Sequence, residues 1–337
     1  MTTKRWVAII VAATLLVVSI GINTLSYFFS QDFSGMMDDF AETSTTDFDE
    51  TVIEKGSGKE RIAVVSLDGV IQDTGGSSSF LSSDGYNHQF FMNQLAEIHE
   101  DSSVKGVVLK VNTPGGGVIE SADIYDAIRE IQSDQEIPVY VSMGGMAASG
   151  GYYVAAPADK IFVNQETLTG SIGVIMESMN YAKLAEKHGI EFNTIKTGPY
   201  KDIMSGSREM TDEERDMLQE MINDSYERFV EIIVDGRNMT EAEVKKVADG
   251  RILNGRQAIE AGLADDYGKA EDVIGAMQSD FELENATVFE YTMSESLSSL
   301  FGLKAKSMFA GNMESEIIGK LLSDHSAPRM MYLYGEK

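Results

Sequence analysis

The stretch that decides the fold runs from residue 104 to residue 143 and reads VKGVVLKVNTPGGGVIESADIYDAIREIQSDQEIPVYVSM. It begins with a β-branched run, passes through a glycine-rich turn into a helical pattern, and ends in a second β-branched run. A strand, a helix and a strand in this order form a crossover unit, which joins parallel strands of one sheet. The stretch therefore predicts an α/β fold with a mainly parallel sheet.

The same alternation continues on both sides of this stretch. Strands are expected at 61–71, 160–164 and 190–197, and helices at 88–100 and from Thr211 to residue 236. The last helix begins with a T-x-x-E capping box. Its apolar stripe suits either a core or a subunit interface and comprises Leu218, Ile222, Tyr226, Phe229 and Ile233. In a parallel sheet, the loops after the carboxyl ends of the strands form the functional site.

The amino-terminal residues predict a membrane anchor. Residues 6–29 contain no charged side chain and are long enough to cross about 30 Å of hydrocarbon. A cleaved signal peptide would have a shorter apolar region and a small-residue cleavage site, so an uncleaved anchor is favoured. Basic residues in 1–5 and acidic residues in 30–60 place the amino terminus in the cytoplasm and the rest of the chain outside it. Residues 30–60 are interpreted as an acidic linker.

Composition excludes several kinds of chemistry. The formal net charge of -27 argues against binding to nucleic acid, which requires clustered basic residues. The absence of cysteine from the sequence excludes disulfides, thiolate metal sites and a cysteine nucleophile. No metal site is expected, because no histidine has the spacing of a metal ligand; the histidines are His88, His99, His188 and His325.

Two loops and one lysine are candidates for catalysis. The loop NTPGGG, residues 112–117, can direct backbone N–H groups at an acyl oxyanion, although an ordinary tight turn has the same composition. Ser149 lies at a strand-to-helix junction, where a serine is either a nucleophile or a helix cap. Without a suitable histidine, a lysine can act as the base where burial lowers its pKa towards neutrality. Lys201, in TGPYKD, is such a candidate, but composition alone does not select it.

Five motifs of the chain resemble, in order and spacing, those of the signal peptide peptidase A family of membrane-anchored serine peptidases. They are VNTPGGGV, GGMAASGGYYVA, TLTGSIGV, TGPYKD and GRILNGRQAIEAGLADDYG, and the resemblance as a whole covers residues 61–275 approximately. The resemblance is to the short, single-repeat bacterial form. It implies a Clp-protease/crotonase-like fold of repeated ββα units, with a peptidase domain at 61–295 and a carboxyl-terminal extension at 296–337.

The resemblance also implies roles for individual residues. Ser149 is then the nucleophile and Lys201 the general base of a Ser-Lys dyad. The backbone N–H groups of Gly116 and Ser149 form the oxyanion hole, and the Ser171 hydroxyl positions the lysine amine. The expected activity is cleavage of remnant signal peptides, without metal or cofactor. The family further implies a ring-like homo-oligomer in which serine and lysine can come from neighbouring subunits.

Two other classes of protein share parts of this pattern. A crotonase-like acyl-CoA hydratase or isomerase has the same oxyanion architecture, but coenzyme A is not expected outside the cytoplasm. A non-catalytic membrane-associated scaffold of the same fold would lack one of the dyad residues. The groove is expected to accept extended apolar peptide with small or aliphatic side chains beside the scissile bond. The tail SAPRMMYLYGEK, residues 326–337, either occupies such a groove of its own or a neighbouring subunit, where it is trimmed, or packs on its own domain.

Overall fold

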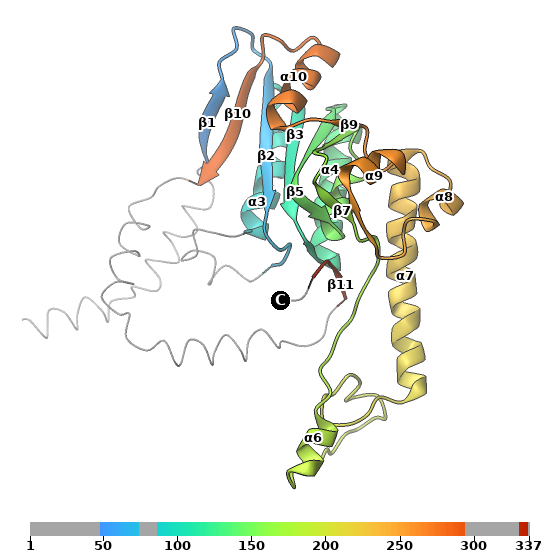
Figure 1. Cartoon of the computed structure of the whole chain (residues 1–337). Helices are drawn as coiled ribbons and strands as arrows, with labels where there is room; N and C mark the ends of the chain where they lie inside the picture. Colours follow the sequence, from blue (N-terminus) through green and yellow to red (C-terminus); the bar gives the residue numbers. More distant parts are fainter. Residues whose placement is uncertain (1–47, 74–85, 294–329, 336–337) are drawn as a thin grey trace, which may run out of the picture. The chain divides into compact units, whose positions relative to one another are not determined.

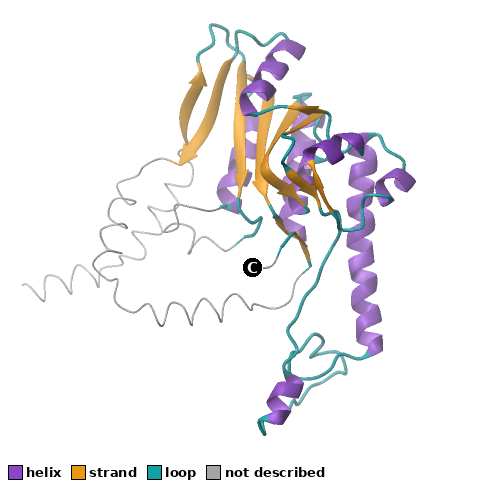
Figure 2. Cartoon of the chain, in the orientation of Figure 1, coloured by secondary structure: helices purple, strands orange, loops and turns teal. Residues whose placement is uncertain are grey.

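The described residues fold around a β-sheet, shown in orange in Figure 2. The structure is a computed structural model that describes residues 48–73, 86–293 and 330–335. The described residues from Glu50 onward belong to one compact unit. The strands of the main sheet are β1 (Phe48–Glu54), β2 (Arg61–Asp68), β3 (Val104–Thr113), β5 (Val139–Ala148), β6 (Lys160–Val163), β7 (Leu168–Gly170), β8 (Ile252–Asn254), β9 (Asp266–Tyr267) and β10 (Thr287–Met293).

The strand order confirms the predicted crossover topology. In the part of the chain that the structure describes, the order is β1-β10-β2-β3-β5-β6-β9, with β7 pairing with β5 and β8. Neighbours from β10 to β9 run parallel, as do β5 and β7, whereas β7 and β8 are antiparallel. A separate short ribbon pairs β4 (Gly115–Gly117) with β11 (Met331–Leu333). This mixed α/β fold with a central sheet fits the expected Clp-protease-like architecture.

Helices cover both faces of the sheet (Figure 1). They are α3 (His88–Glu100), α4 (Val118–Gln135), α5 (Gly150–Ala155), α6 (Ala182–Lys187), α7 (Asp212–Arg237), α8 (Glu241–Lys245), α9 (Gly255–Glu260) and α10 (Ala270–Asp280). Alternate residues of β2 enter different cores, because successive side chains of a strand point to opposite faces. Ile62 and Val64 pack in the smaller core with α10, and Ala63 and Val65 in the larger core with α3, α4, α5 and α7.

Helix α7 confirms the helix predicted from Thr211. The Thr211 hydroxyl accepts the Glu214 N–H (3.2 Å), and the Glu214 carboxylate accepts the Thr211 N–H (2.9 Å), which forms the predicted capping box. The apolar stripe divides along the helix: Phe229 and Ile233 are buried, whereas Leu218 is only half-buried. The carboxyl-terminal half of α7 is therefore part of the core, and its amino-terminal half lies near the surface.

Two expectations from the sequence differ from the structure. Residues 190–197 form no strand, because the chain leaves the sheet after Ile175 and no described strand lies beside this segment. Its apolar side chains are instead exposed, and Ile195 is fully exposed. Residues 48–54, which were expected to belong to the acidic linker, form β1 at the edge of the sheet.

Several predicted segments lie outside the described residues. These are the cytoplasmic terminus at 1–5, the anchor at 6–29, most of the linker and most of the extension at 296–337. Of the helices that the structure does describe, none combines the length and apolar character needed to cross a membrane.

Candidate active site

The candidate site lies at the edge of the sheet where three strands end. β3 ends at Thr113, β5 at Ala148 and β7 at Gly170, and the pairing registers bring these ends together. They are followed by the glycines of β4, by Ser149 and by Ser171, respectively. The carboxyl edge of a parallel sheet is where α/β proteins bind their ligands. The structure thus brings three of the four motifs with predicted site residues to one place.

Ser149 has an unusual backbone conformation between β5 and α5. Its φ of 53° and ψ of -114° lie in a region that side-chain-bearing residues rarely adopt. Hydrogen bonds on both sides hold this conformation: the Ser149 N–H donates to the Gly170 carbonyl (2.8 Å), and the Ser149 carbonyl accepts from the Tyr153 N–H (2.9 Å). Only 1% of the residue is exposed. The turn is therefore sharp and rigid, as at the nucleophile elbow of α/β hydrolases.

The two glycines after Ser149 allow α5 to pack directly on its neighbours. A Cβ at Gly150 would lie 2.7 Å from Ser121 Oγ of α4, and a Cβ at Gly151 would lie 2.7 Å from Thr113 Cγ2 of β3. Both distances are shorter than van der Waals contact, so any larger residue would push α5 away from the sheet. The sequence S-G-G at this turn is therefore a steric requirement of the site.

The strained backbone gives a stability prediction. Ser149→Ala and Ser149→Gly both remove the hydroxyl, but only glycine adopts this φ without strain. Relief of strain, less the entropy that glycine adds to the unfolded chain, should make Ser149→Gly more stable than Ser149→Ala by about 1 kcal/mol. Denaturant unfolding of the two variants measures this difference. An alanine variant as stable as the glycine variant would show that the turn stores no strain.

Strand β4 is an extended backbone platform with hydrogen-bonding groups on both edges. On one edge, the Ile71 N–H donates to the Gly115 carbonyl (2.9 Å), and the Gly117 N–H donates to the Ile71 carbonyl (2.8 Å). Since successive residues of a strand direct their backbone groups to opposite edges, the Gly116 N–H and carbonyl face the other edge. The chain's own segment β11 occupies that edge.

The tail lies between β4 and Ile175 as an extended strand. Its register places Tyr332 opposite Gly116, and Met331 exchanges two backbone hydrogen bonds with Ile175 (2.9 and 3.0 Å). The Tyr332 carbonyl oxygen comes very close to the nucleophile turn. A Cβ at Gly115, whose φ is 97°, would lie 2.1 Å from that oxygen and 2.6 Å from the Gly150 nitrogen. One peptide carbonyl thus sits where β4 and the start of α5 converge.

The Tyr332 side chain fills an aromatic pocket beside this carbonyl. Its ring stacks on Tyr153 with centroids 4.8 Å apart and lies 4.9 Å from the Phe229 ring. Its hydroxyl donates to the Ser225 carbonyl of α7 (2.9 Å), and burial raises the pKa of this phenol. An open space of about 330 Å³ adjoins the ring. The sequence predicts small or aliphatic side chains beside the scissile bond, but this pocket is large enough to enclose a complete tyrosine side chain.

One of the two expected oxyanion donors, the Ser149 N–H, already has a backbone acceptor. The Ser149 N–H points to the Gly170 carbonyl, because β5 continues its pairing with β7 up to this residue. The next N–H, that of Gly150, begins α5 and has no acceptor within the helix. Ser171 follows directly, with a φ of 51° and its N–H donating to the Arg251 carbonyl (2.7 Å). Ser171 thus lies next to the carbonyl that holds the nucleophile turn.

Lys201 lies in a different part of the structure from Ser149. It belongs to the segment between β7 and α7, which carries α6 at the amino-terminal end of α7, away from the sheet (Figure 1). The residue is exposed, and its amine makes no hydrogen bond or ion pair with any residue that the structure describes. A single chain therefore does not join the two members of the predicted dyad by a hydrogen bond.

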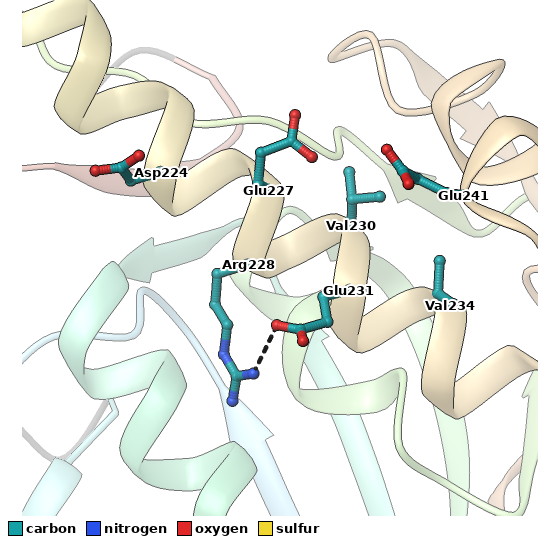
Figure 3. Close-up of a pocket in the computed structure, with 7 residues that line it drawn as sticks. All are labelled: Asp224, Glu227, Arg228, Val230, Glu231, Val234 and Glu241. Carbon is teal, nitrogen blue, oxygen red and sulfur yellow. Dashed lines mark hydrogen bonds and ion pairs between the residues drawn. The ribbon is translucent and has the colours of Figure 1, made fainter.

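A further pocket on the exposed face of α7 has no hydroxyl or thiol side chain in its lining. Figure 3 shows this pocket, in which Arg228 is ion-paired with Glu231 (3.0 Å). Acidic side chains form most of the other polar lining, and they include Glu227 and Glu241. Across the described ranges, histidine, aspartate and glutamate form no cluster of three or more that could hold a metal ion. The edge with Ser149 is thus the candidate site.

Comparison with known proteins defines the class. Residues 131–284 match Peptidase family S49, so the chain is a serine peptidase by class. A signal peptide peptidase SppA of Enterococcus faecium is 39% identical over 99% of both chains. A protease of Methanocaldococcus jannaschii is 41% identical, over 64% of this chain and 68% of its own. Protease 4 of Haemophilus influenzae is 34% identical over 66% of this chain, but this region is only 37% of that longer protein.

The full-length match to the Enterococcus protein identifies the family. The chain belongs to the signal peptide peptidase A family of S49 peptidases, as its motifs predicted.

Proposed function

We propose that this protein is a membrane-anchored endopeptidase in which Ser149 attacks a peptide carbonyl and Lys201 acts as the general base. The observation that carries the proposal is the docked tail, which lies as an extended strand with one carbonyl beside the nucleophile turn. Family membership favours this activity over an acyl-CoA enzyme or a non-catalytic scaffold, and both dyad residues are present.

The Gly116 and Gly150 N–H groups are the proposed oxyanion hole. Gly116 faces the docked strand, and the Gly150 nitrogen and the Tyr332 carbonyl oxygen both lie within 2.6 Å of the same point beside Gly115. Two backbone donors aimed at one acyl oxygen stabilise the negative charge that develops there during attack. Gly150 replaces Ser149 as the second donor, because the Ser149 N–H is already bonded to the Gly170 carbonyl.

A neighbouring subunit is the proposed source of the lysine. The segment that carries Lys201 exposes several large apolar side chains, namely Met179, Leu184, Ile190, Phe192 and Ile195. Exposed apolar groups gathered on one segment are typical of a protein interface. In a ring of identical chains, this segment would be covered by the next subunit and would bring Lys201 to that subunit's Ser149. Ser171, which lies beside the nucleophile turn, is the proposed acceptor of a hydrogen bond from the arriving amine.

The reaction follows from these positions. The neutral Lys201 amine takes the Ser149 proton as the hydroxyl oxygen bonds to the scissile carbonyl carbon. The resulting ammonium then protonates the leaving amine as the C–N bond breaks, which leaves an acyl-enzyme. Water then attacks the ester carbonyl carbon while Lys201 takes one of its protons, and Lys201 returns this proton to the Ser149 oxygen as the bond between that oxygen and the acyl carbon breaks. The carboxylic acid product loses its remaining proton to water. Atoms and charges balance without any metal or cofactor.

Extended apolar peptides are the proposed substrates. β4 and Ile175 pair with the backbone of a bound strand on its two edges, which requires an unfolded segment. The uncharged segment 6–29 would hold the catalytic domain at the outer surface of the membrane, where remnant signal peptides remain after secretion. The aromatic pocket adds a preference for a large side chain on the acyl side of the cut.

The docked tail gives a test of this function. With the Tyr332 carbonyl in the oxyanion hole, the bond to be cut is the one between Tyr332 and Leu333. Incubation of the purified full-length chain should therefore remove the five residues from Leu333 to Lys337. Intact-mass measurement over time detects this loss, and Ser149→Ala should keep the complete terminus.

The control for this test is an added apolar peptide in the same sample. A wild-type chain that cuts the added peptide but keeps its own terminus would contradict trimming, although the tail could still occupy the groove. A wild-type chain that cuts neither would count against the peptidase proposal itself.

A further inference from the structure

The two residues that flank Lys201 are both attached to the first turn of α7. On the amino side, the Tyr200 hydroxyl donates to the Glu213 carboxylate (2.5 Å). On the carboxyl side, Asp202 accepts a hydrogen bond from Arg208 (2.6 Å). Lys201 itself has no such attachment to any described residue, so its amine remains available while the backbone on either side of it is held.

The residues around Lys201, from Lys196 to Asp202, form a turn that we call the lysine turn. Arg208 joins this turn to α7 through one guanidinium group. It donates to both the side chain and the backbone carbonyl of Asp202 (2.6 and 3.2 Å), and both terminal nitrogens donate to the Glu214 carboxylate, at 2.5 and 2.8 Å. Lys196 closes the turn from the other side, with its amine donating to Asp202 (2.6 Å) and to the Pro199 carbonyl (2.8 Å). A planar guanidinium can make these paired contacts, whereas an ammonium group cannot.

The carboxylates of this network are held in their charged form. Glu214 is only 2% exposed and belongs to the capping box of α7. Its hydrogen bonds to Arg208 and to the Thr211 N–H lower its pKa to about 2, and Arg208 together with Lys196 lowers the pKa of Asp202 below its usual range. A carboxyl group whose pKa is lower in the folded than in the unfolded protein stabilises the fold at pH values above its usual pKa. This stabilisation is lost as the pH falls through the lowered pKa of the folded protein. The network is therefore intact at neutral pH.

Helix α7 extends from this network to the aromatic pocket. Its amino-terminal turn holds Arg208 through Glu214. Further along the helix, the Ser225 carbonyl accepts the Tyr332 hydroxyl, and the Phe229 ring contacts the Tyr332 ring. Phe229 is buried in the core, so the helix cannot shift without disturbing the fold. The helix thus fixes the lysine turn relative to a rigid part of the molecule.

We propose that Arg208 is a positioning residue of the peptidase, which fixes the Lys201 turn on α7 so that the amine is presented at the serine hydroxyl it deprotonates. The inference rests on the proposed role of Lys201 as the base. The proposed action of Arg208 is indirect and runs through its hydrogen bonds to Asp202. A displacement of about 1 Å in a catalytic group costs up to about 100-fold in rate.

Arg208→Gln in the full-length chain tests the proposal. Because β4 and the aromatic pocket are unchanged, KM for an apolar peptide should stay within about twofold, whereas kcat should fall by about 100-fold. Arg208→Lys, which retains the charge but not the paired contacts, should recover part of the loss. The matched control is Arg256→Gln, which removes an exposed ion pair to Glu260 (2.6 Å) on α9, outside the segment that carries Lys201. This control should retain wild-type kcat.

Asp202→Asn provides the second test, in case Arg208→Gln fails to fold or assemble. This variant retains the contact between Arg208 and Glu214, and therefore the capping box of α7. It weakens the hydrogen bond between Arg208 and the side chain of residue 202. A folded Asp202→Asn or Arg208→Gln chain with wild-type kcat, or with an altered KM alone, would overturn the inference. If Lys201→Met also retains activity, the proposed base has failed; if Lys201→Met is inactive, only the role of Arg208 has failed.

Discussion

Ser149→Ala is expected to abolish peptide cleavage, lowering kcat/KM by about 10⁴-fold or more. Ser149 lies at the turn between β5 and α5, beside the Tyr332 carbonyl, whereas the neighbouring Ser121 hydroxyl already donates to the Gly117 carbonyl (2.8 Å). The oxyanion donors belong to the backbone and remain in place, but without an attacking oxygen no acyl-enzyme forms. Steady-state cleavage of an apolar peptide by the full-length chain measures the loss.

The stability of the fold provides the control for this variant. Alanine removes one oxygen atom from a residue that is 1% exposed, so the fold should be unchanged. The denaturant midpoint of Ser149→Ala should therefore match that of the wild type. Turnover by Ser149→Ala above about one tenth of the wild-type rate would exclude Ser149 as the nucleophile, because loss of a true nucleophile costs far more.

Lys201→Met and Lys201→Arg are expected to be nearly as damaging, with losses of about 10³-fold to 10⁴-fold in kcat. Methionine has a similar length but cannot take a proton. Arginine retains the positive charge, yet its guanidinium stays protonated in proteins and cannot act as a base. Since the base must be neutral, kcat/KM of the wild-type enzyme should rise with pH. Initial rates from pH 6 to pH 10 measure both effects.

Mixed assemblies distinguish the source of the lysine. Ser149→Ala and Lys201→Met are each inactive alone, but in a mixed ring some intact serines would lie beside intact lysines of the neighbouring chain. Partial activity after co-assembly is the expected result. A mixture that stays inactive, in assemblies shown to contain both chains, would assign both residues of a site to one subunit. Lys201→Arg with near wild-type kcat would exclude Lys201 as the base altogether.

Local patterns predicted several elements that build the site, but not the short strands β4 and β7. The β-branched runs at 104–112 and 137–143 are strands of the sheet, and the capping box at Thr211 begins α7. The apolar run at 190–197 forms no strand despite its β-branched and aromatic residues, because a strand requires a neighbouring strand and the described structure provides none there. Propensity therefore failed where the chain leaves the sheet.

Features that depend on tertiary contacts were not predictable from the sequence. The N–H of Ser149 was expected to face an oxyanion, but the length of the pairing between β5 and β7 directs it to Gly170. The aromatic pocket joins Tyr153, from the GGMAASGGYYVA motif, to Phe229 of α7, which is distant in the sequence, and no local pattern indicated that the two rings meet. Docking of the tail was anticipated from its composition, whereas its register against β4 came from the structure alone.

Trapping the acyl-enzyme tests the central claim most directly. An activated ester of a peptide that ends in tyrosine acylates with little help from a base, whereas hydrolysis of the acyl-enzyme needs Lys201. The full-length Lys201→Met chain, quenched in acid after mixing with this ester, should therefore carry the acyl mass on Ser149, as located by fragment mapping. The double variant with Ser149→Ala should carry none. An acyl group on another residue, or undiminished labelling of the double variant, would contradict the assignment of Ser149 as the nucleophile.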